Sequence, residues 1–220
     1  MNYTELAAAV RSYAENDFPD TVGTGGMTSD EQVAMFVREA EQRIYNSVQL
    51  LVERFRTTLT CTPSDPYLAY PADWLAGISL AAVAPSNGDY YFLLNKDVEF
   101  IREAYPNPAN TARPQYYAYD DSSQFILGPT PDTAYSMELV YYKYPTSIVD
   151  AGTSWLGDNM DSVLLYGALL EAAAFMKSEE DTVKTYQQRY DEALVQLKML
   201  AEGKDRQDTY RTPQARYPVK

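Results

Sequence analysis

The sequence contains no histidine and a single cysteine, Cys61. The lack of histidine excludes imidazole acid–base chemistry, His-based catalytic triads and His-ligated metals. One cysteine excludes an internal disulfide and argues against a structural zinc site. Without a histidine partner, Cys61 is best interpreted as a small core residue. We therefore expect no catalysis, no metal and no cofactor.

Positive charge is scarce, and so are long apolar runs. The 220 residues carry 18 Lys and Arg against 31 Asp and Glu, a formal net charge of −13. A negative field repels phosphate, so sequence-specific nucleic-acid binding is not expected. No run approaches the roughly 20 apolar residues of a membrane span. The first residues carry Glu5 and Glu15 rather than the basic start of a signal peptide. We expect a protein that is made and kept in a reducing cytosol, or in an assembly that forms there.

Helical patterns occupy both ends of the chain. Asn2 and Thr28 each have a glutamate three residues on, which is the capping-box spacing, and they open predicted helices over 3–16 and from 28 to about 55. Asp158 is the predicted N-cap of a third helix at 159–177, which is apolar over much of its girth.

A fourth predicted helix ends near Ala201, with Gly203 as the residue that stops it. Between the second and third helices, prolines interrupt helical periodicity and period-two patterns predict strands. The predicted strands are 57–61, 67–70, 77–83 and 90–94, and a β-meander of 115–119, 124–127 and 135–144; a short helix is predicted at 95–105.

These patterns predict an α+β protein built as a four-helix bundle with an inserted small antiparallel β-domain and an extended C-terminal arm. Residues 1–56 and 157–202 would form the bundle, 57–156 the β-rich insert, and 203–220 the arm.

Three acidic clusters could hold a general acid–base pair or a hard metal ion: 30–31, 120–121 and 179–181. All three fall at predicted turns or helix starts, where Asp and Glu satisfy local backbone groups and the helix dipole, so we prefer a structural interpretation. The glycine-rich stretch 23–26 lacks the Lys-Ser/Thr ending of a phosphate-binding loop and does not follow a strand.

Tyrosine is unusually abundant, with 20 residues, and it is concentrated in the β-rich region. Rings at alternating strand positions cannot all face one core, so some should point outward. Core filling, protein binding and saccharide binding would all use such rings. The candidates for a partner-facing surface are Tyr90, Tyr91, Tyr116, Tyr117, Tyr119 and Tyr141.

The last segment, 203–220, has no apolar periodicity and carries five basic residues against two acidic ones. It could be an idle terminus, bind nucleic acid by counterion release, or order on a partner protein. Interleaved aromatic residues and prolines favour the protein partner. Its candidate contact residues are Arg206, Tyr210, Arg211, Pro213, Arg216 and Tyr217.

An ordered set of stretches resembles the head-to-tail adaptor (connector) proteins of short-tailed bacteriophages, over about residues 3–200. These stretches are YTEL at 3–6, FVREAEQRIY at 36–45, LAYPADWL at 68–75, RPQYYA at 113–118, FILGPTPDTAY at 125–135, WLGDN at 155–159 and LLYGA at 164–168.

The resemblance implies a twelve-subunit ring beneath the portal, in the virion neck, assembled in the host cytoplasm. The C-terminal arm would bind the portal protein, and the tyrosine-rich β-domain would face the tail nozzle protein. As a hypothesis, acidic side chains of the helices line a channel through which DNA passes without specific binding. Two alternatives stay open: a carbohydrate-binding or carbohydrate-processing protein that uses the tyrosine-rich β-face, and a related neck or tail-completion protein.

Overall fold

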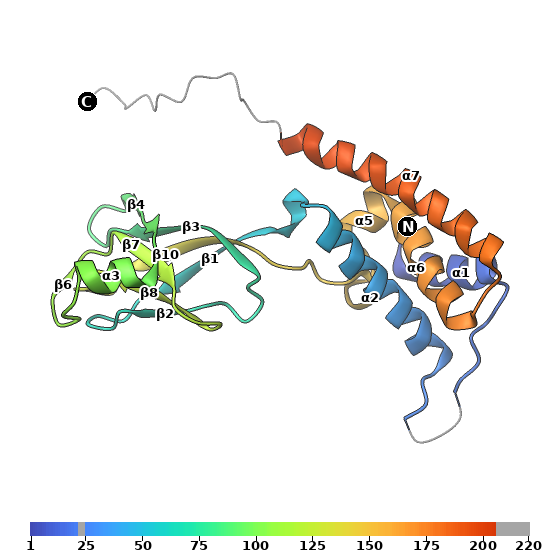
Figure 1. The fold of residues 1–220 in the computed structure, drawn as a ribbon, viewed down its shortest axis with the longest axis horizontal. Helices are drawn as coiled ribbons and strands as arrows, with labels where there is room; N and C mark the ends of the chain where they lie inside the picture. The colour runs from blue at the N-terminus through green and yellow to red at the C-terminus, as the bar shows by residue number, and fades with distance from the viewer. Residues whose placement is uncertain (22–24, 206–220) are drawn as a thin grey trace. The chain divides into compact units, whose positions relative to one another are not determined.

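The computed structural model describes residues 1–21 and 25–205, with side chains described as far as Ala201 (Figure 1). The chain divides into two compact units. Met1–Val52 and the described residues from Pro145 onward form a helical unit, and Glu53–Tyr144 form a β-rich unit. The segment 145–156, which the sequence predicted within the β-rich insert, belongs to the helical unit.

The helical unit is organised around one apolar helix, α6, which contacts three other long helices. Because α6 is buried on most sides, its apolar residues run around the helix rather than along one stripe. Among the described residues, the α-helices of this unit are α1 (Tyr3–Ala14), α2 (Ser29–Ser47), α4 (Ile148–Ala151), α5 (Trp155–Asn159), α6 (Asp161–Met176) and α7 (Glu180–Asp205). The assignment of α1, α2, α6 and α7 to a four-helix bundle stays a prediction.

Both predicted capping boxes are confirmed. The Asn2 side chain accepts from the Glu5 N–H at 2.9 Å, and the Glu5 carboxylate accepts from the Asn2 N–H at 2.9 Å. Thr28 and Glu31 make the same reciprocal pair at the start of α2. These bonds satisfy backbone donors that the first helical turn leaves without partners.

Three predicted helix boundaries are wrong. Helix α2 ends at Ser47 rather than near residue 55, because Phe55 lies in a strand whose pairing overrides the helical periodicity. Asp158 is not the N-cap of α6; it lies inside α5, which Ser154 caps by accepting from the Gly157 N–H. Gly203 lies within α7, since one glycine costs a long helix only about 1 kcal/mol.

The β-rich unit contains two four-stranded sheets and a two-stranded one. The first sheet is entirely antiparallel, in the order β1-β10-β3-β4, and the second has the order β2-β8-β7-β5. The bounds are β1 (Arg54–Thr60), β2 (Tyr67–Ala69), β3 (Ala76–Val83), β4 (Tyr90–Phe92), β5 (Leu94–Asn95), α3 (Val98–Ala104), β6 (Thr111–Ala112), β7 (Tyr116–Tyr119), β8 (Gln124–Gly128), β9 (Thr130–Pro131) and β10 (Ser136–Tyr142). Two short pairs, β5–β7 and β6–β9, are parallel, so the unit is not purely antiparallel.

The predicted meander of three consecutive strands is wrong. Strands β7 and β8 pair with each other in the second sheet, but β10 lies in the first sheet between β1 and β3. Alternate β10 side chains are buried in a core to which both sheets contribute. The Phe125 ring, fully buried, lies in this core 4.4 Å from the Tyr70 ring centroid, and Tyr70 stacks on Trp74 at 4.2 Å.

Candidate interaction surfaces

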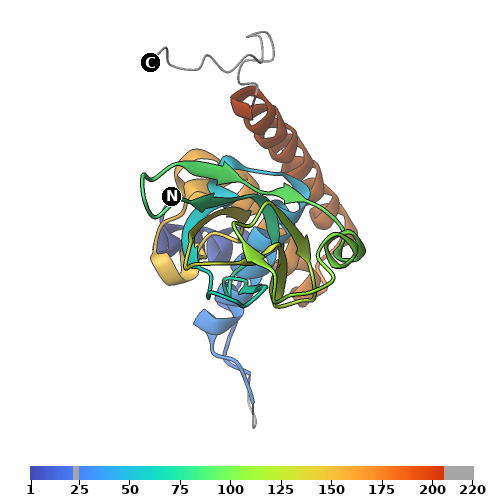
Figure 2. The same ribbon diagram turned by 90° about the vertical axis from the view of Figure 1, so that its left-hand side faces the viewer.

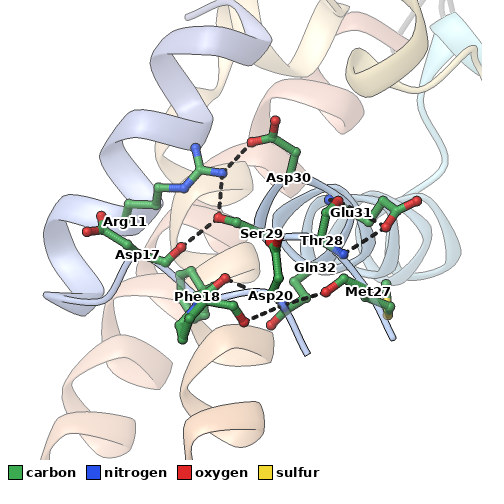
Figure 3. A network of polar contacts seen from close by, with 11 residues as sticks. Arg11, Asp17, Phe18, Asp20, Met27, Thr28, Ser29, Asp30, Glu31 and Gln32 are labelled. Carbon is green, nitrogen blue, oxygen red and sulfur yellow. Dashed lines mark hydrogen bonds and ion pairs between the residues drawn. The ribbon is translucent and has the colours of Figure 1, made fainter. Parts of the chain in front are cut away.

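A polar network fixes the connector between α1 and α2 (Figure 3). The Arg11 guanidinium donates to Asp30 Oδ1 at 2.6 Å and to Ser29 Oγ at 3.1 Å. Ser29 Oγ donates to the Asp17 carbonyl at 2.6 Å, and the Ser29 N–H donates to Asp20 Oδ1 at 2.7 Å. Two of these four hydrogen bonds tie α1 to the start of α2, and the other two hold Asp17 and Asp20 in the first part of the connector.

Gln32 on α2 also binds the connector. Its side chain is 1% exposed, and its amide donates to the carbonyls of Pro19 at 3.1 Å and Met27 at 3.2 Å. One buried amide thus holds Pro19 and Met27, two separate parts of the connector, which meets the requirement that a buried polar group be hydrogen-bonded. The acidic pair of Asp30 and Glu31 belongs to this framework, and the hydrogen bond from the Thr28 backbone lowers the pKa of Glu31.

The other two acidic clusters also have local partners. Asp121 Oδ1 accepts from the backbone N–H groups of Ser123 at 2.6 Å and Gln124 at 3.1 Å, and hydrogen bonds from Ser123 lower the pKa of Asp121. Asp120 lies 3.6 Å from the Arg102 guanidinium. In the third cluster, residues 179–181, two carboxylates lie within 4 Å of one lysine in the next helical turn. Within residues 1–21 and 25–205, no group of three or more Cys, Asp or Glu residues could hold a metal ion.

Cys61 is a core residue, as predicted. It is 1% exposed, and its sulfur accepts from the Tyr135 N–H at 3.2 Å. Burial raises the pKa of the Cys61 thiol, which opposes formation of a reactive thiolate.

Two of the six predicted partner-facing tyrosines are buried. Tyr117 and Tyr141 are each 4% exposed, because both side chains occupy inward positions of their strands. The Tyr117 ring packs edge-on against Phe125, and the Tyr141 hydroxyl donates to Asp73 Oδ1 at 2.9 Å. Neither ring can contact a partner in this fold, so the prediction for these two residues is wrong.

The other four rings reach the surface to different degrees. Tyr90 is 53% exposed and donates to Glu138 Oε2 at 3.3 Å, and Tyr119 is 39% exposed. Tyr91 and Tyr116 are half-buried. The Arg113 guanidinium lies over the Tyr91 ring at 3.9 Å, and the Tyr116 ring packs against Phe100 on α3.

The most exposed apolar side chains of the β-rich unit are not among the predicted partner-facing residues. Phe92 is 68% exposed and Leu94 is 59% exposed. With Tyr90 they form what we call the β4–β5 edge, where the chain passes from the first sheet to the second. Figure 2 shows the strands of this unit from the side that is on the left in Figure 1. Period-two alternation through YYFLL at 90–94 indicates that positions 90, 92 and 94 share one face, but only tyrosines were considered as partner-facing residues.

Each unit contains an apolar cleft. The cleft beneath α3 has a volume of about 250 Å³ and is lined by aromatic, aliphatic and proline side chains with Arg102 at its margin. The cleft in the helical unit has about 210 Å³ and includes Leu50, Leu51 and Leu200. Neither cleft brings together a nucleophile and a base. No helix of the described residues is long and apolar enough to cross a membrane.

All six predicted contact residues of the arm, from Arg206 to Tyr217, lie outside the described residues. The described part offers exposed aromatic and aliphatic side chains at a strand edge and rigid, locally paired polar clusters. These features define a protein whose surfaces suit contacts with other proteins.

The particular family follows from comparison with known proteins. The model of the SU10 adaptor protein family matches residues 1–217, so this chain belongs to that family, a head-to-tail adaptor family of phages. It is therefore a structural adaptor protein of a phage, and membership implies contacts with portal and tail components and a place in the virion neck. No curated protein matches the sequence.

Proposed function

We propose that this protein forms a ring, of twelve subunits, which joins the portal to the tail nozzle and lets DNA pass through its centre. The observation that carries the proposal is the exposed β4–β5 edge in a chain of the adaptor family. Apolar side chains exposed to this degree are typical of surfaces that bind other proteins. The ring would act by binding alone, without catalysis.

The C-terminal arm is the proposed portal-binding element. Because α7 continues through Gly203 to Asp205, the arm would begin at Arg206, at the end of a helix of 26 residues. Its arginines and tyrosines would pair with acidic and apolar groups of the portal. A ring that presents many arms gains affinity from effective concentration even if each contact is weak.

The β-rich unit is the proposed tail-facing element. Tyr90 and Tyr119 are exposed enough to contact a tail protein, with Tyr91 and Tyr116 at the margin of that surface. The net charge of −13 supports a channel that does not retain DNA, since like charge disfavours phosphate contacts.

Native mass spectrometry of the purified protein, alone and mixed with portal rings, tests the proposal. The full chain should join the portal as a multi-subunit ring, whereas a chain ending at Asp205 should lose portal binding with its helices intact by circular dichroism. A matched variant, Thr182→Ala on the helical unit, should bind as the full chain does. If the full chain ignores the portal and stays monomeric, the proposal fails, and a glycan array becomes the test of the carbohydrate-binding alternative.

A further inference from the structure

The first sheet of the β-rich unit ends in two free edges. Its order is β1-β10-β3-β4, and no strand of the described residues pairs with the outer side of β1 or β4. An unpaired strand edge presents backbone N–H and C=O groups, so it is a ready template for another chain. β1 is seven residues long and contains no proline.

Hydrogen bonds at the two ends of β1 show which of its residues point their backbone N–H and C=O groups away from β10. The Cys61 N–H donates to the Tyr135 carbonyl at 3.2 Å, and the Lys143 N–H donates to the Glu53 carbonyl at 3.0 Å. Antiparallel pairs alternate between hydrogen-bonded and non-hydrogen-bonded. In the register of β1 with β10, the odd-numbered residues from 53 to 61 therefore bond to β10. Arg56, Thr58 and Thr60 therefore direct their backbone groups to the free edge.

Strand β4 also directs alternate backbone groups to a free edge. The Ala84 N–H donates to the Asp89 carbonyl, and the Leu93 N–H donates to the Leu80 carbonyl, each at 2.9 Å. In the register of β3 with β4, Tyr91 bonds to β3. Tyr90 and Phe92 consequently present their backbone groups to the outside.

The two edges match in direction and in side-chain parity. Each of the three pairings between β1 and β4 is antiparallel, so β1 and β4 run in opposite directions. Residues directly opposite one another share a face, and one such row runs from Thr58 through Glu138 and Ala81 to Phe92. If β1 of one copy lies beside β4 of another, the two strands are therefore antiparallel. The side chains of Thr58 and Phe92 then lie on the same face of the joined sheet.

Side-chain chemistry favours the same arrangement. If Thr58 of one copy lies opposite Phe92 of the next, Arg56 becomes a diagonal neighbour of that ring, within reach of a long side chain. Arg56 is exposed, with 69% of its side chain accessible, and lies 3.6 Å from Glu138. An arginine over the exposed Phe92 ring would add a cation–π contact and cover apolar surface.

We infer that β1 of one subunit pairs with β4 of the next, so that the sheet continues head to tail from copy to copy. This inference rests on the proposed ring and names the surface that forms it. Joining two different edges is a heterologous contact, which closes into a ring when the rotation between copies allows it. Both the β1 edge and the β4 edge would thus bind a second copy of this chain.

Cysteine cross-linking tests the pairing. The full chain carrying both Thr60→Cys and Tyr90→Cys, which lie directly opposite one another when Thr58 pairs with Phe92, is treated with a short bifunctional maleimide that spans about 8 Å, enough to bridge opposite residues whose Cβ atoms are about 5 Å apart. A denaturing gel should show a ladder of linked species beyond the dimer. Each single variant should give none, and Cys61 should not react because it is buried.

A backbone variant gives an independent readout. Thr58→Pro removes an outward N–H that β10 does not use, so the monomer should fold while assembly weakens by about tenfold or more, the effect of one lost hydrogen bond that leaves its partner unsatisfied. Thr58→Ala keeps the N–H and should assemble as the wild type does.

The outcomes separate the inference from the proposed function. A ring in the native mass spectrum without cross-links from the double variant would overturn the edge pairing alone. Dimers from a single variant would also overturn it, because they indicate pairing of like edges. Absence of any oligomer, with or without portal, would overturn both.

Discussion

Glu41 offers a sharp test of how the chain returns from the β-rich unit to the helical unit. This carboxylate on α2 is 3% exposed, and its Oε1 accepts from the Ile148 N–H at 2.9 Å, at the first residue of α4. Ile148 is itself fully buried. Replacing Glu41 by Gln keeps an acceptor oxygen, whereas replacing it by Ala leaves the Ile148 N–H without a partner.

The expected magnitudes differ between these two variants. Glu41→Ala should lower the free energy of unfolding by about 2–3 kcal/mol, from an unsatisfied buried donor and lost packing. Glu41→Gln should change it by less than about 1 kcal/mol at neutral pH, because the weaker neutral hydrogen bond is offset by relief from burying a charge.

The pH dependence follows from the pKa of Glu41. Burial raises this pKa above its ordinary value of 4.5, against the hydrogen bonds from Ser147 and Ile148. The folded state then holds the proton to higher pH than the unfolded state does. The contribution of Glu41 to stability is therefore fully present below about pH 4.5 and is lost as pH rises through the folded-state pKa. Glu41→Gln should remove this slope.

The assay is urea denaturation from pH 4 to 8, followed by tryptophan fluorescence. The chain has two tryptophans, Trp74 in the β-rich unit and Trp155 in the helical unit. A Trp74→Phe background leaves Trp155 to report on the unit that contains Glu41. Equal destabilisation by the Gln and Ala variants, or a wild-type stability that rises with pH through this window relative to Glu41→Gln, would refute the reasoning.

Three further predictions concern the β-rich unit. Phe125→Ala should lower stability by about 3–5 kcal/mol and weaken the near-UV circular dichroism of the aromatic core; an unchanged unfolding midpoint would contradict the packing. Gly128→Ala should cost about 1–3 kcal/mol in urea denaturation, since the added Cβ would lie 2.8 Å from Ile101 Cγ2, and a neutral effect would show that the neighbour moves aside. In alkaline titration followed by tyrosinate absorbance, three rings should ionise only near pH 12, and because burial raises their pKa the fold should lose stability as pH rises from 10 towards 12; a single titration step near pH 10 would disprove this. These three are Tyr70, Tyr117 and Tyr135.

Local signals in the sequence predicted the local structure well. The capping boxes at Asn2 and Thr28 depend on residues three positions apart, and both are present as predicted. The end of α2 could not be predicted in this way. Phe55 continues the apolar stripe of the predicted helix, but it pairs with Tyr141 of β10, some 80 residues later in the chain, and that pairing determines its conformation.

The surface was harder to predict than the elements. Tyr116 and Tyr117 are neighbours on β7, yet the first is half-exposed and the second is buried, because successive side chains point to opposite faces. Which face is the core depends on how the two sheets share their strands, and no local pattern specifies that. Phe92 was overlooked for the same reason, since a phenylalanine in a strand is normally assigned to the core.

The charge of the protein bears on how copies can meet. Each chain carries a formal charge of −13, so assembled copies repel one another at distances shorter than the screening length, about 8 Å at physiological ionic strength. The contacts that would hold the proposed ring of subunits together must therefore be short-ranged and largely non-ionic. Otherwise they must place lysine or arginine side chains next to acidic or aromatic ones. Backbone pairing along a strand edge is independent of net charge. The β1 and β4 edges would place Arg56 beside the Phe92 ring at the boundary where copies touch, so these edges suit self-association despite the net negative charge.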